Sequence, residues 1–251
     1  MDLRFTKLRV CDDAWLIVDR RGAAGADPDW AACAKVLCHR SRGAAARGLV
    51  VLEGAGAPLL ARSWDARGEA CPLSPSAILC AARWAFDNGL ADGDAVRIMA
   101  REGEREAFAL DSQSLGVGLG RVELNRARGG FTARAMGREL RLVLADGEPL
   151  RRRQARPGRE ADGRRPSSLE AGVISRSRIV MSRPGEDGLL AAAVALTAAH
   201  EAGLADREAS VEWRGESVLA QLLEDGEAYA AAVAVYVIRG EFWAGDLQPE
   251  K

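Results

Sequence analysis

The sequence predicts an α+β fold built as two pseudo-symmetric domains. Residues 74–92 read SPSAILCAARWAFDNGLAD and residues 188–206 read GLLAAAVALTAAHEAGLAD, so two apolar helices end in the same four residues at a constant offset. Strand-like runs outnumber helical runs, and each half of the chain carries one long helix. These observations favour two domains with a cleft between them, each a curved β-sheet wrapped around a long helix.

Short apolar runs bounded by turn residues predict the strands of the first half. These runs are WLIVD at 15–19, GLVVLE at 48–53, 58–65, AVRIMA at 95–100, EAFAL at 106–110 and GVGLGRVEL at 116–124. A short helix is expected over 29–38. The long helix begins at the N-cap Ser74, has Pro75 at its first position and stops at Gly89, which favours a C-terminal cap.

The second half shows strand patterns on both sides of its long helix. They are FTARAM at 131–136, ELRLVLAD at 139–146, GVISRS at 172–177, RIVMSR at 178–183, and ASVEWRG, VLAQLL and AAAVAVYVIRGEFW after the helix. The Arg-rich segment 149–168 is predicted as a mobile charged loop, and the alternative is a basic lip that grips an acidic segment. The predicted domains are 1–120, completed by a C-terminal strand at 233–251, and 121–232.

The composition is that of an ordinary globular protein and excludes several classes of function. The 251 residues are 48% hydrophobic and 28% charged, and the net charge of −1 at pH 7 gives no sign of a nucleic-acid partner. No apolar run is long enough to span a membrane, and the N-terminal segment lacks the apolar core of a signal peptide. The five cysteines are an odd number, all in the first third of the chain, so a reducing cytoplasm is expected rather than a disulfide framework.

Motifs along nearly the whole chain carry a resemblance to a known enzyme family. AARGL at 45–49 stands where that family has Gly-Ala-Asp-Gly-Leu, and WDARGEA at 64–70 stands where it has Phe-Asn-Ala-Asp-Gly-Ser-Glu. SPSAILC at 74–80 keeps the spacing of Cys-Gly-Asn-Gly-x-x-Cys, and MGREL at 136–140 corresponds to Met-Gly-Asn-Pro-His. SRPGED at 182–187 lies in the place of Glu-Arg-Gly-x-Gly-Glu-Thr. The chain therefore resembles the diaminopimelate epimerases, and the resemblance implies their fold.

The chemistry that the resemblance implies needs two cysteines, and neither is retained. The family moves a proton on and off an α-carbon without a cofactor, using a thiolate and a thiol at the two helix starts. Ser74 and Gly188 stand at those positions; serine is a poor base without an activator, and glycine has no side chain. Because no cysteine follows Cys80, a two-thiol mechanism is impossible within one chain. Classical epimerase activity is predicted to be absent, and no cofactor is expected.

Other catalytic chemistry is sparsely supplied. His39 and His200 are the two histidines and lie in different halves, which predicts no histidine-rich metal site and weakens any Ser-His-Asp arrangement. Phenazine-type isomerases of related fold use a glutamate as acid and base, and Glu69, Glu139, Glu186 or Asp187 could take that role here. Asp65 and Glu186 are the candidate catalysts of an isomerase or cyclase. The alternative for such carboxylates is a solvated or helix-capping role.

The predicted cleft combines aspartate, arginine and serine. Asp13 and Asp65 stand where the resemblance places neutral, substrate-contacting asparagines, and Pro75 removes a backbone N–H donor from one helix start. Such a cleft suits an extended peptide, held at an exposed strand edge, better than a free amino acid. The residues predicted to bind the ligand are Asp13, Asp65, Ser74, Ser76, Arg138, Arg183, Glu186 and Asp187.

Three functions follow. The leading hypothesis is a catalytically silent protein that binds a peptide in the inter-domain groove and guides precursor-peptide modification in ribosomal peptide natural-product biosynthesis. Its partners would be that peptide and the modifying enzymes. The second is a cofactor-independent isomerase or cyclase that uses carboxylates on a peptide or amino acid. The third is a structural pseudoenzyme that pairs with an active homologue. Active relatives commonly form homodimers, so a homodimer is a further expectation from the resemblance.

Overall fold

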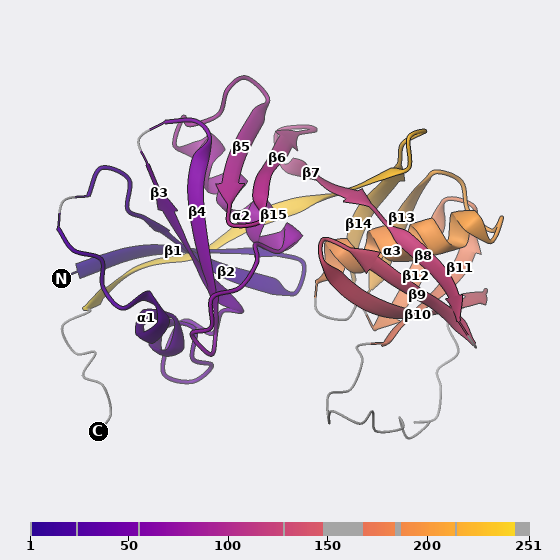
Figure 1. The fold of residues 1–251 in the computed structure, drawn as a ribbon, viewed down its shortest axis with the longest axis horizontal. Helices are drawn as coiled ribbons and strands as arrows, with labels where there is room; N and C mark the ends of the chain where they lie inside the picture. The colour runs from indigo at the N-terminus through magenta and orange to yellow at the C-terminus, as the bar shows by residue number, and fades with distance from the viewer. Residues whose placement is uncertain are drawn as a thin grey trace. The chain divides into compact units, whose positions relative to one another are not determined.

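The chain, seen in a computed structural model, divides by its contacts into two compact units (Figure 1). The first unit comprises Met1–Val117 and Val233–Lys251, and the second comprises Gly118–Ala232. The structure describes residues 2–23, 25–54, 56–127, 129–147, 168–183, 187–213 and 215–243. All but the last residue of the predicted loop at 149–168 therefore lies outside the described residues. Those described form fifteen strands and three helices, so the fold is mostly β, with a larger share of strand than an even α+β mixture.

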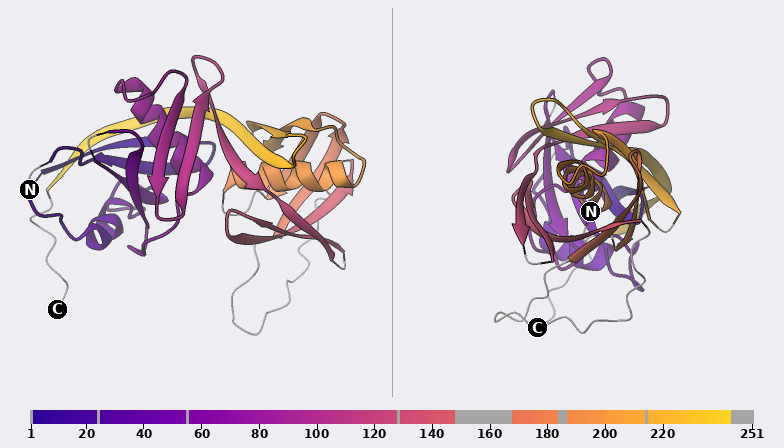
Figure 2. Two further views of the ribbon diagram at one scale, coloured as in Figure 1. Left: turned by 45° about the horizontal axis from the view of Figure 1, so that its top comes forward. Right: turned by 90° about the vertical axis from the view of Figure 1, so that its right-hand side faces the viewer.

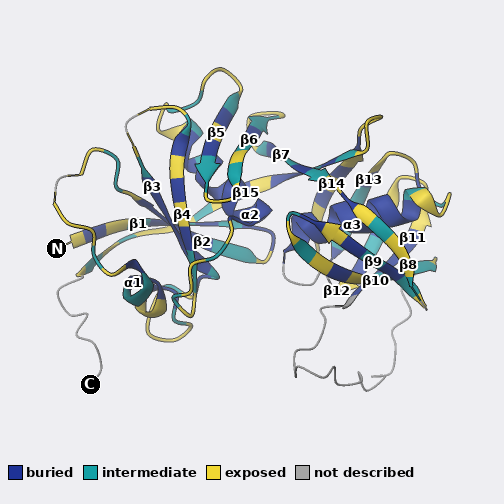
Figure 3. Cartoon of the chain, in the orientation of Figure 1, coloured by how far each residue is buried: buried dark blue, intermediate teal, exposed yellow. Residues whose placement is uncertain are grey.

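The first unit is a barrel-like sheet with helix α2 packed against it. In chain order its elements are β1 (Asp2–Val10), β2 (Asp13–Asp19), α1 (Trp30–Leu37), β3 (Gly48–Glu53), β4 (Leu59–Asp65), α2 (Pro75–Asp87), β5 (Ala95–Ala100), β6 (Gly103–Ala109) and β7 (Ser114–Arg121). These strands are neighbours in sequence order, and the long strand β15 (Glu227–Trp243) is the neighbour of both β7 and β1. Helix α2 contacts β1, β2, β3, β5 and β6, and ten of its thirteen residues are buried (Figure 3).

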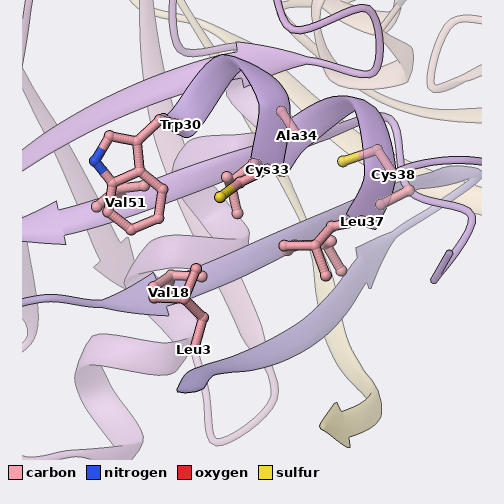
Figure 4. Close-up of a cluster of buried hydrophobic side chains, with 11 residues drawn as sticks. Leu3, Val18, Trp30, Cys33, Ala34, Leu37, Cys38 and Val51 are labelled. Atoms are coloured by element: carbon pink, nitrogen blue, oxygen red, sulfur yellow. The ribbon is translucent and has the colours of Figure 1, made fainter. Parts of the chain in front are cut away.

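Local signals in the sequence explain where the two helices of the first unit begin and end. The Ser74 side chain caps α2 by accepting the Ala77 N–H, and Gly89 follows the helix with a φ of +68°. Asp29 caps α1 in the same manner. Helix α1 packs on β1, β2 and β3 through a buried apolar cluster (Figure 4). Its members include Leu3, Val18, Trp30, Cys33, Ala34, Leu37, Cys38 and Val51.

The second unit repeats the topology of the first. Its elements are β8 (Glu123–Ala127), β9 (Gly130–Ala135), β10 (Arg138–Asp146), β11 (Ser168–Ser175), β12 (Arg178–Arg183), α3 (Gly188–Glu201), β13 (Glu208–Trp213), β14 (Glu216–Leu222) and the start of β15. From β9 to β15 the successive strand pairs are antiparallel, parallel, antiparallel, parallel, antiparallel and antiparallel, the same series as from β1 to β7. The repeat seen at 74–92 and 188–206 thus extends over both units.

Helix α3 is the apolar centre of the second unit. Every residue from Gly188 to Ala199 is buried, and the helix contacts β9, β10, β11, β13 and β14. Figure 2 shows α3 end-on in its right-hand view, with strands of the second unit around it. Among the described residues no helix is long and apolar enough to cross a membrane.

The glycine-rich run at 116–124 differs from the single strand predicted there. The chain leaves β7 after Arg121 and begins β8 at Glu123. A Cβ on Gly116 would lie 2.5 Å from the Phe108 ring, and one on Gly118 would lie 3.4 Å from the Tyr229 ring. Alternate glycines therefore make room for aromatic rings on one face of β7, which accounts for the glycines without a phosphate-binding role.

Candidate functional site

The start of α2 is a buried network of hydrogen bonds. Ser74 and Ser76 are each 1% exposed, and their hydroxyl oxygens lie 3.0 Å apart. The indole Nε1–H of Trp15 donates to the Ser76 hydroxyl at 3.0 Å. In the described part of the chain, Ser74 Oγ contacts that hydroxyl and the Ala77 N–H, and no base is placed to activate it. The first of the two positions at which the resemblance implies a thiol therefore holds a structural serine.

The start of α3 is filled by packing instead. Asp187 is 3% exposed, and its Oδ1 accepts the N–H groups of Leu189 and Leu190 at 3.0 and 3.2 Å, so Asp187 is the N-cap. A Cβ on Gly188 would lie 2.2 Å from Cζ2 of Trp213. The indole of Trp213, itself 2% exposed, thus takes the space that a cysteine side chain would need.

A buried tryptophan therefore covers each helix start from within its own unit. Trp15 lies on β2, and a Cβ on Gly48 would come 2.4 Å from its ring, so the indole packs directly on β3. Trp15 is hydrogen-bonded, whereas Nε1 of Trp213 is buried and has no hydrogen-bond partner in the structure described. Both N-terminal positions that the resemblance assigns to acid–base chemistry are therefore buried and occupied by side chains of the same unit.

The predicted carboxylates of the first unit serve local structure. Asp13 pairs with Arg47 at 2.5 Å. Oδ1 of Asp65 accepts the N–H groups of Arg67 and Glu69, both at 2.9 Å, and so holds the turn that follows β4. Asp65 is nevertheless on the sheet face that looks toward α2, because it is the register partner of Gly48, which in turn is the partner of Trp15.

A polar pocket of about 570 Å³ surrounds Arg138 in the second unit. The turn between β9 and β10 forms one wall, and the end of β7 with the start of β8 forms the other. Its charged lining residues are Arg121, Glu123, Arg134, Arg138 and Glu139. Arg134 lies 3.5 Å from Glu139 and opposite Glu123 in the β8–β9 register, so its charge is balanced within the sheet. The lining thus holds three arginines and two glutamates.

The structure distributes the predicted ligand-binding residues over both units. Arg183 ends β12, but its side chain is outside the described part of the structure, as is all of Glu186. The structure thus groups Asp13, Asp65, Ser74 and Ser76 in the first unit, and Arg138 and Asp187 in the second. The groove between the two domains stays a prediction. Among the described residues no group of His, Cys, Asp and Glu is arranged to hold a metal ion.

Sequence reasoning missed a second pocket, of about 490 Å³, in the first unit. It lies beside β4 and the turn after β5, and is lined mainly by Arg62, Trp64, Cys71, Pro72, Arg101 and Glu102. The Arg62 guanidinium lies 5.3 Å from the Trp64 ring centroid, and hydrogen bonds to Glu53 and Asp27 raise the pKa of Arg62. Cys71 is the one cysteine of the five that is not fully buried. The position of Cys71 ahead of the first helix is the signal that could have pointed to this pocket.

No protein-family model matches the sequence, and no curated protein matches it either. Solved structures do. A phenazine biosynthesis protein of the PhzF family from Enterococcus faecalis superposes with a TM-score of 0.68 at 9% identity, covering 97% of this chain and 100% of that one. A predicted epimerase from Pseudomonas aeruginosa gives a TM-score of 0.67 at 16% identity, covering 96% and 99%.

A hydroxyproline epimerase from Agrobacterium vitis, solved with trans-4-hydroxy-L-proline, gives a TM-score of 0.59 at 12% identity and covers 96% of this chain and 92% of its own. The chain shares the fold of these PhzF-family and hydroxyproline-epimerase structures. It is the diaminopimelate-epimerase type of fold that the sequence motifs implied. At these identities the likeness shows the fold, and activity has to be argued from the site.

Proposed function

We propose that this chain is a catalytically silent protein of the epimerase-type fold that binds a peptide in the groove between its two domains. In this proposal it presents a precursor peptide to modifying enzymes in ribosomal peptide natural-product biosynthesis. The proposed absence of catalysis rests on Gly188, where the Trp213 indole occupies the space that the second thiol would need. The sequence supports it further, since no cysteine follows Cys80.

The buried polar groups at the start of α2 also support the proposed absence of catalysis. A serine nucleophile or base needs a neighbour that takes its proton. Ser74 instead caps a helix and contacts another serine. The family-type proton transfer would require a solvent-excluded but open position beside the helix N-terminus, and in each unit a tryptophan ring is packed there.

Peptide binding, the other part of the proposal, is supported by charged side chains at positions where the resemblance places neutral ones. Asp13 with Arg47 and Asp65 in one unit, and Arg138 in the other, supply both donors and acceptors suited to main-chain and side-chain groups of a peptide. Calorimetric titration with candidate precursor peptides and a random peptide pool tests it. Binding of a peptide with no binding of free amino acids is expected, and absence of binding to every peptide would sink the proposal.

A carboxylate-dependent isomerase or cyclase is the second candidate, and Asp65 is the observation that favours it. Oδ1 of Asp65 holds the turn, while Oδ2 makes no hydrogen bond within the described residues and the side chain is half-buried on the face toward α2. Solvent deuterium entering a bound peptide, and lost in Asp65→Asn, would favour this function over the silent one.

A further inference from the structure

Part of one edge of β4 has no neighbouring strand among the described residues. Strand β3 pairs with the other edge throughout this part. Strand β5 pairs with this edge at Leu59 and Leu60 only. From the other end, the returning chain reaches the same edge where the Cys71 N–H donates to the Ser63 C=O at 3.0 Å. We call the edge between these two contacts, at residues 61–63, the β4 gap.

Two main-chain groups of β4 face the gap. Successive residues of a strand point their N–H and C=O groups to opposite edges, so those of Ala61 and Ser63 point to the same edge. Cys71 uses the Ser63 C=O. In the part of the chain that the structure describes, no backbone hydrogen bond uses the Ser63 N–H or the Ala61 C=O. The β4 gap therefore presents one acceptor and one donor, spaced as on an unpaired strand edge.

The first-unit pocket of about 490 Å³ lies at this gap. Its lining comes from three segments, 61–64, 70–72 and 100–102. The charged side chain of Arg62 in this lining is already hydrogen-bonded to Glu53 and Asp27. The apolar lining residues are Ala61, Trp64, Ala70, Pro72 and Ala100. The pocket thus offers apolar surface next to the two main-chain groups.

One residue of an added parallel chain would satisfy both groups. In a parallel pair, the residue opposite position i donates its N–H to the C=O of residue i−1 and accepts the N–H of residue i+1. Opposite Arg62, such a residue would donate to the Ala61 C=O and accept from the Ser63 N–H. This register continues that of β5, which ends at Ala100. The side chain of the added residue would lie on the same face as Arg62 and Trp64, since side chains alternate along a strand.

We infer that the β4 gap binds one extended residue of a peptide, with an uncharged apolar side chain, between the Ala61 C=O and the Ser63 N–H. The main-chain hydrogen bonds would hold the peptide, and the apolar lining near Trp64 would select the side chain. Segments 70–72 and 100–102 flank the gap and limit the pairing to that residue. This inference rests on the proposed function and adds to it a main-chain contact and the kind of side chain that the contact admits.

The main-chain contact is tested with N-acetyl-leucine methylamide, which carries one residue with both main-chain groups. Its matched control is the ester in which an oxygen replaces the leucine N–H, because the ester keeps the shape and loses the donor to the Ala61 C=O. NMR titration of the isotope-labelled protein should show the ester binding about tenfold more weakly. Equal binding of the two compounds would overturn the inference.

The place of binding is tested on two neighbouring amides of β4. The Ser63 N–H points into the gap, whereas the Trp64 N–H points to β3, where Leu49 is its register partner. Saturating N-acetyl-leucine methylamide should move the Ser63 amide proton downfield, and by more than that of Trp64. Shifts confined to amides outside the pocket lining would contradict the inference.

The pocket is tested with Ala100→Leu against Ala95→Leu. Both alanines are half-buried on β5, and of the two only Ala100 lines the pocket. Ala100→Leu should weaken binding about tenfold, and Ala95→Leu should leave it unchanged. Equal binding by the two variants would overturn the inference. If Ala100→Leu fails to fold, alkylation of Cys71, the one cysteine that is not fully buried, fills the pocket instead and should weaken binding likewise.

The outcomes separate this inference from the proposed function. If a random peptide pool binds while N-acetyl-leucine methylamide does not, the inference fails and the proposed function stands. If the methylamide binds in the gap and no peptide binds, the site stands and the proposed function fails. If neither binds, both fail.

Discussion

The starts of α2 and α3 occupy equivalent places in the repeat, yet different interactions fill them. At α2 a tryptophan reaches the helix through a hydrogen bond, from Trp15 Nε1 to the Ser76 hydroxyl at 3.0 Å. At α3 a tryptophan reaches it through contact alone, with the Trp213 ring against Gly188. Where the resemblance implies two thiols, one helix start holds a polar network and the other a packed ring. The comparison teaches that equivalent helix starts can be filled in two physically distinct ways while the fold stays the same.

Removing the ring that fills the α3 start should have the largest effect. Trp213→Ala leaves a cavity in a fully buried site, and it should lower the free energy of unfolding by about 3–5 kcal/mol. Trp243 is 57% exposed on β15, so Trp243→Ala is the matched control and should change little. Denaturant unfolding checks both. A loss below about 1 kcal/mol in Trp213→Ala would show that packing does not close the α3 start.

Placing a cysteine at each of the two helix starts should have the next largest effect and should distinguish the two starts. Gly188→Cys forces the Trp213 ring to move and should cost about 1–3 kcal/mol of stability. Ser74→Cys fits the existing space and should cost about 1 kcal/mol, through the weakened helix cap. The penalty of Gly188→Cys should shrink in a Trp213→Ala background, because the two side chains compete for one volume. Thermal unfolding of the single and double variants gives the coupling, and an additive result would contradict the packing account.

The two tryptophans should also differ when each is replaced by phenylalanine. Trp15→Phe removes a buried hydrogen-bond donor from Ser76, whereas Trp213→Phe removes an Nε1–H that is already unpartnered among the described residues. Trp15→Phe should therefore be the more destabilising, by about 1–3 kcal/mol. Equal losses in denaturant unfolding would break the contrast between a polar and an apolar closure.

Alkaline pH should lower the stability of the first unit, by less than the substitutions above. All five cysteines lie in it. Burial, then the charge of Asp29, raises the pKa of Cys33 to about 11, and burial, then the charge of Asp65, raises the pKa of Cys38 to about 12. Below the unfolded pKa of about 8.5 both states keep their protons. Stability is then lost as pH rises through the folded values, because the unfolded chain ionises first.

Amide hydrogen exchange followed from neutral pH to above pH 9, corrected for the intrinsic rate, checks this loss residue by residue. Protection should fall in α1 before it falls in α3, since α1 carries Cys33 and is followed directly by Cys38. In a variant with Cys33 and Cys38 both changed to alanine, protection in α1 should no longer fall before protection in α3. A fall of the same size in both units would assign the pH effect to other groups.

Local rules predicted much of the fold. The N-cap Ser74 followed by Pro75 placed the start of α2, and short apolar runs placed β5 and β12 at their observed bounds. The break at Val122 between β7 and β8 was missed, because the apolar run continues through it while the pairing changes strand. Backbone pairing of that kind depends on the rest of the sheet and not on the local sequence.

The candidate site was less predictable than the fold. That neither helix start carries a cysteine follows directly from Ser74 and Gly188 in the sequence. What replaced them could not, because Trp15 and Trp213 reach the helix starts from distant strands and the contact is set by tertiary packing. Asp65 was predicted as a ligand or base, and its role in the turn through Arg67 and Glu69 depends on backbone geometry that the sequence does not show.

The most direct test of the central claim is mass spectrometry of the ligand retained by the protein after incubation in D₂O with a pool of peptides and free amino acids. The account predicts that peptides are retained and that they, and the amino acids, come off without deuterium at carbon. Retention of a free amino acid that carries solvent deuterium at its α-carbon, with no peptide retained, would contradict the account and return the chain to the epimerases whose fold it shares.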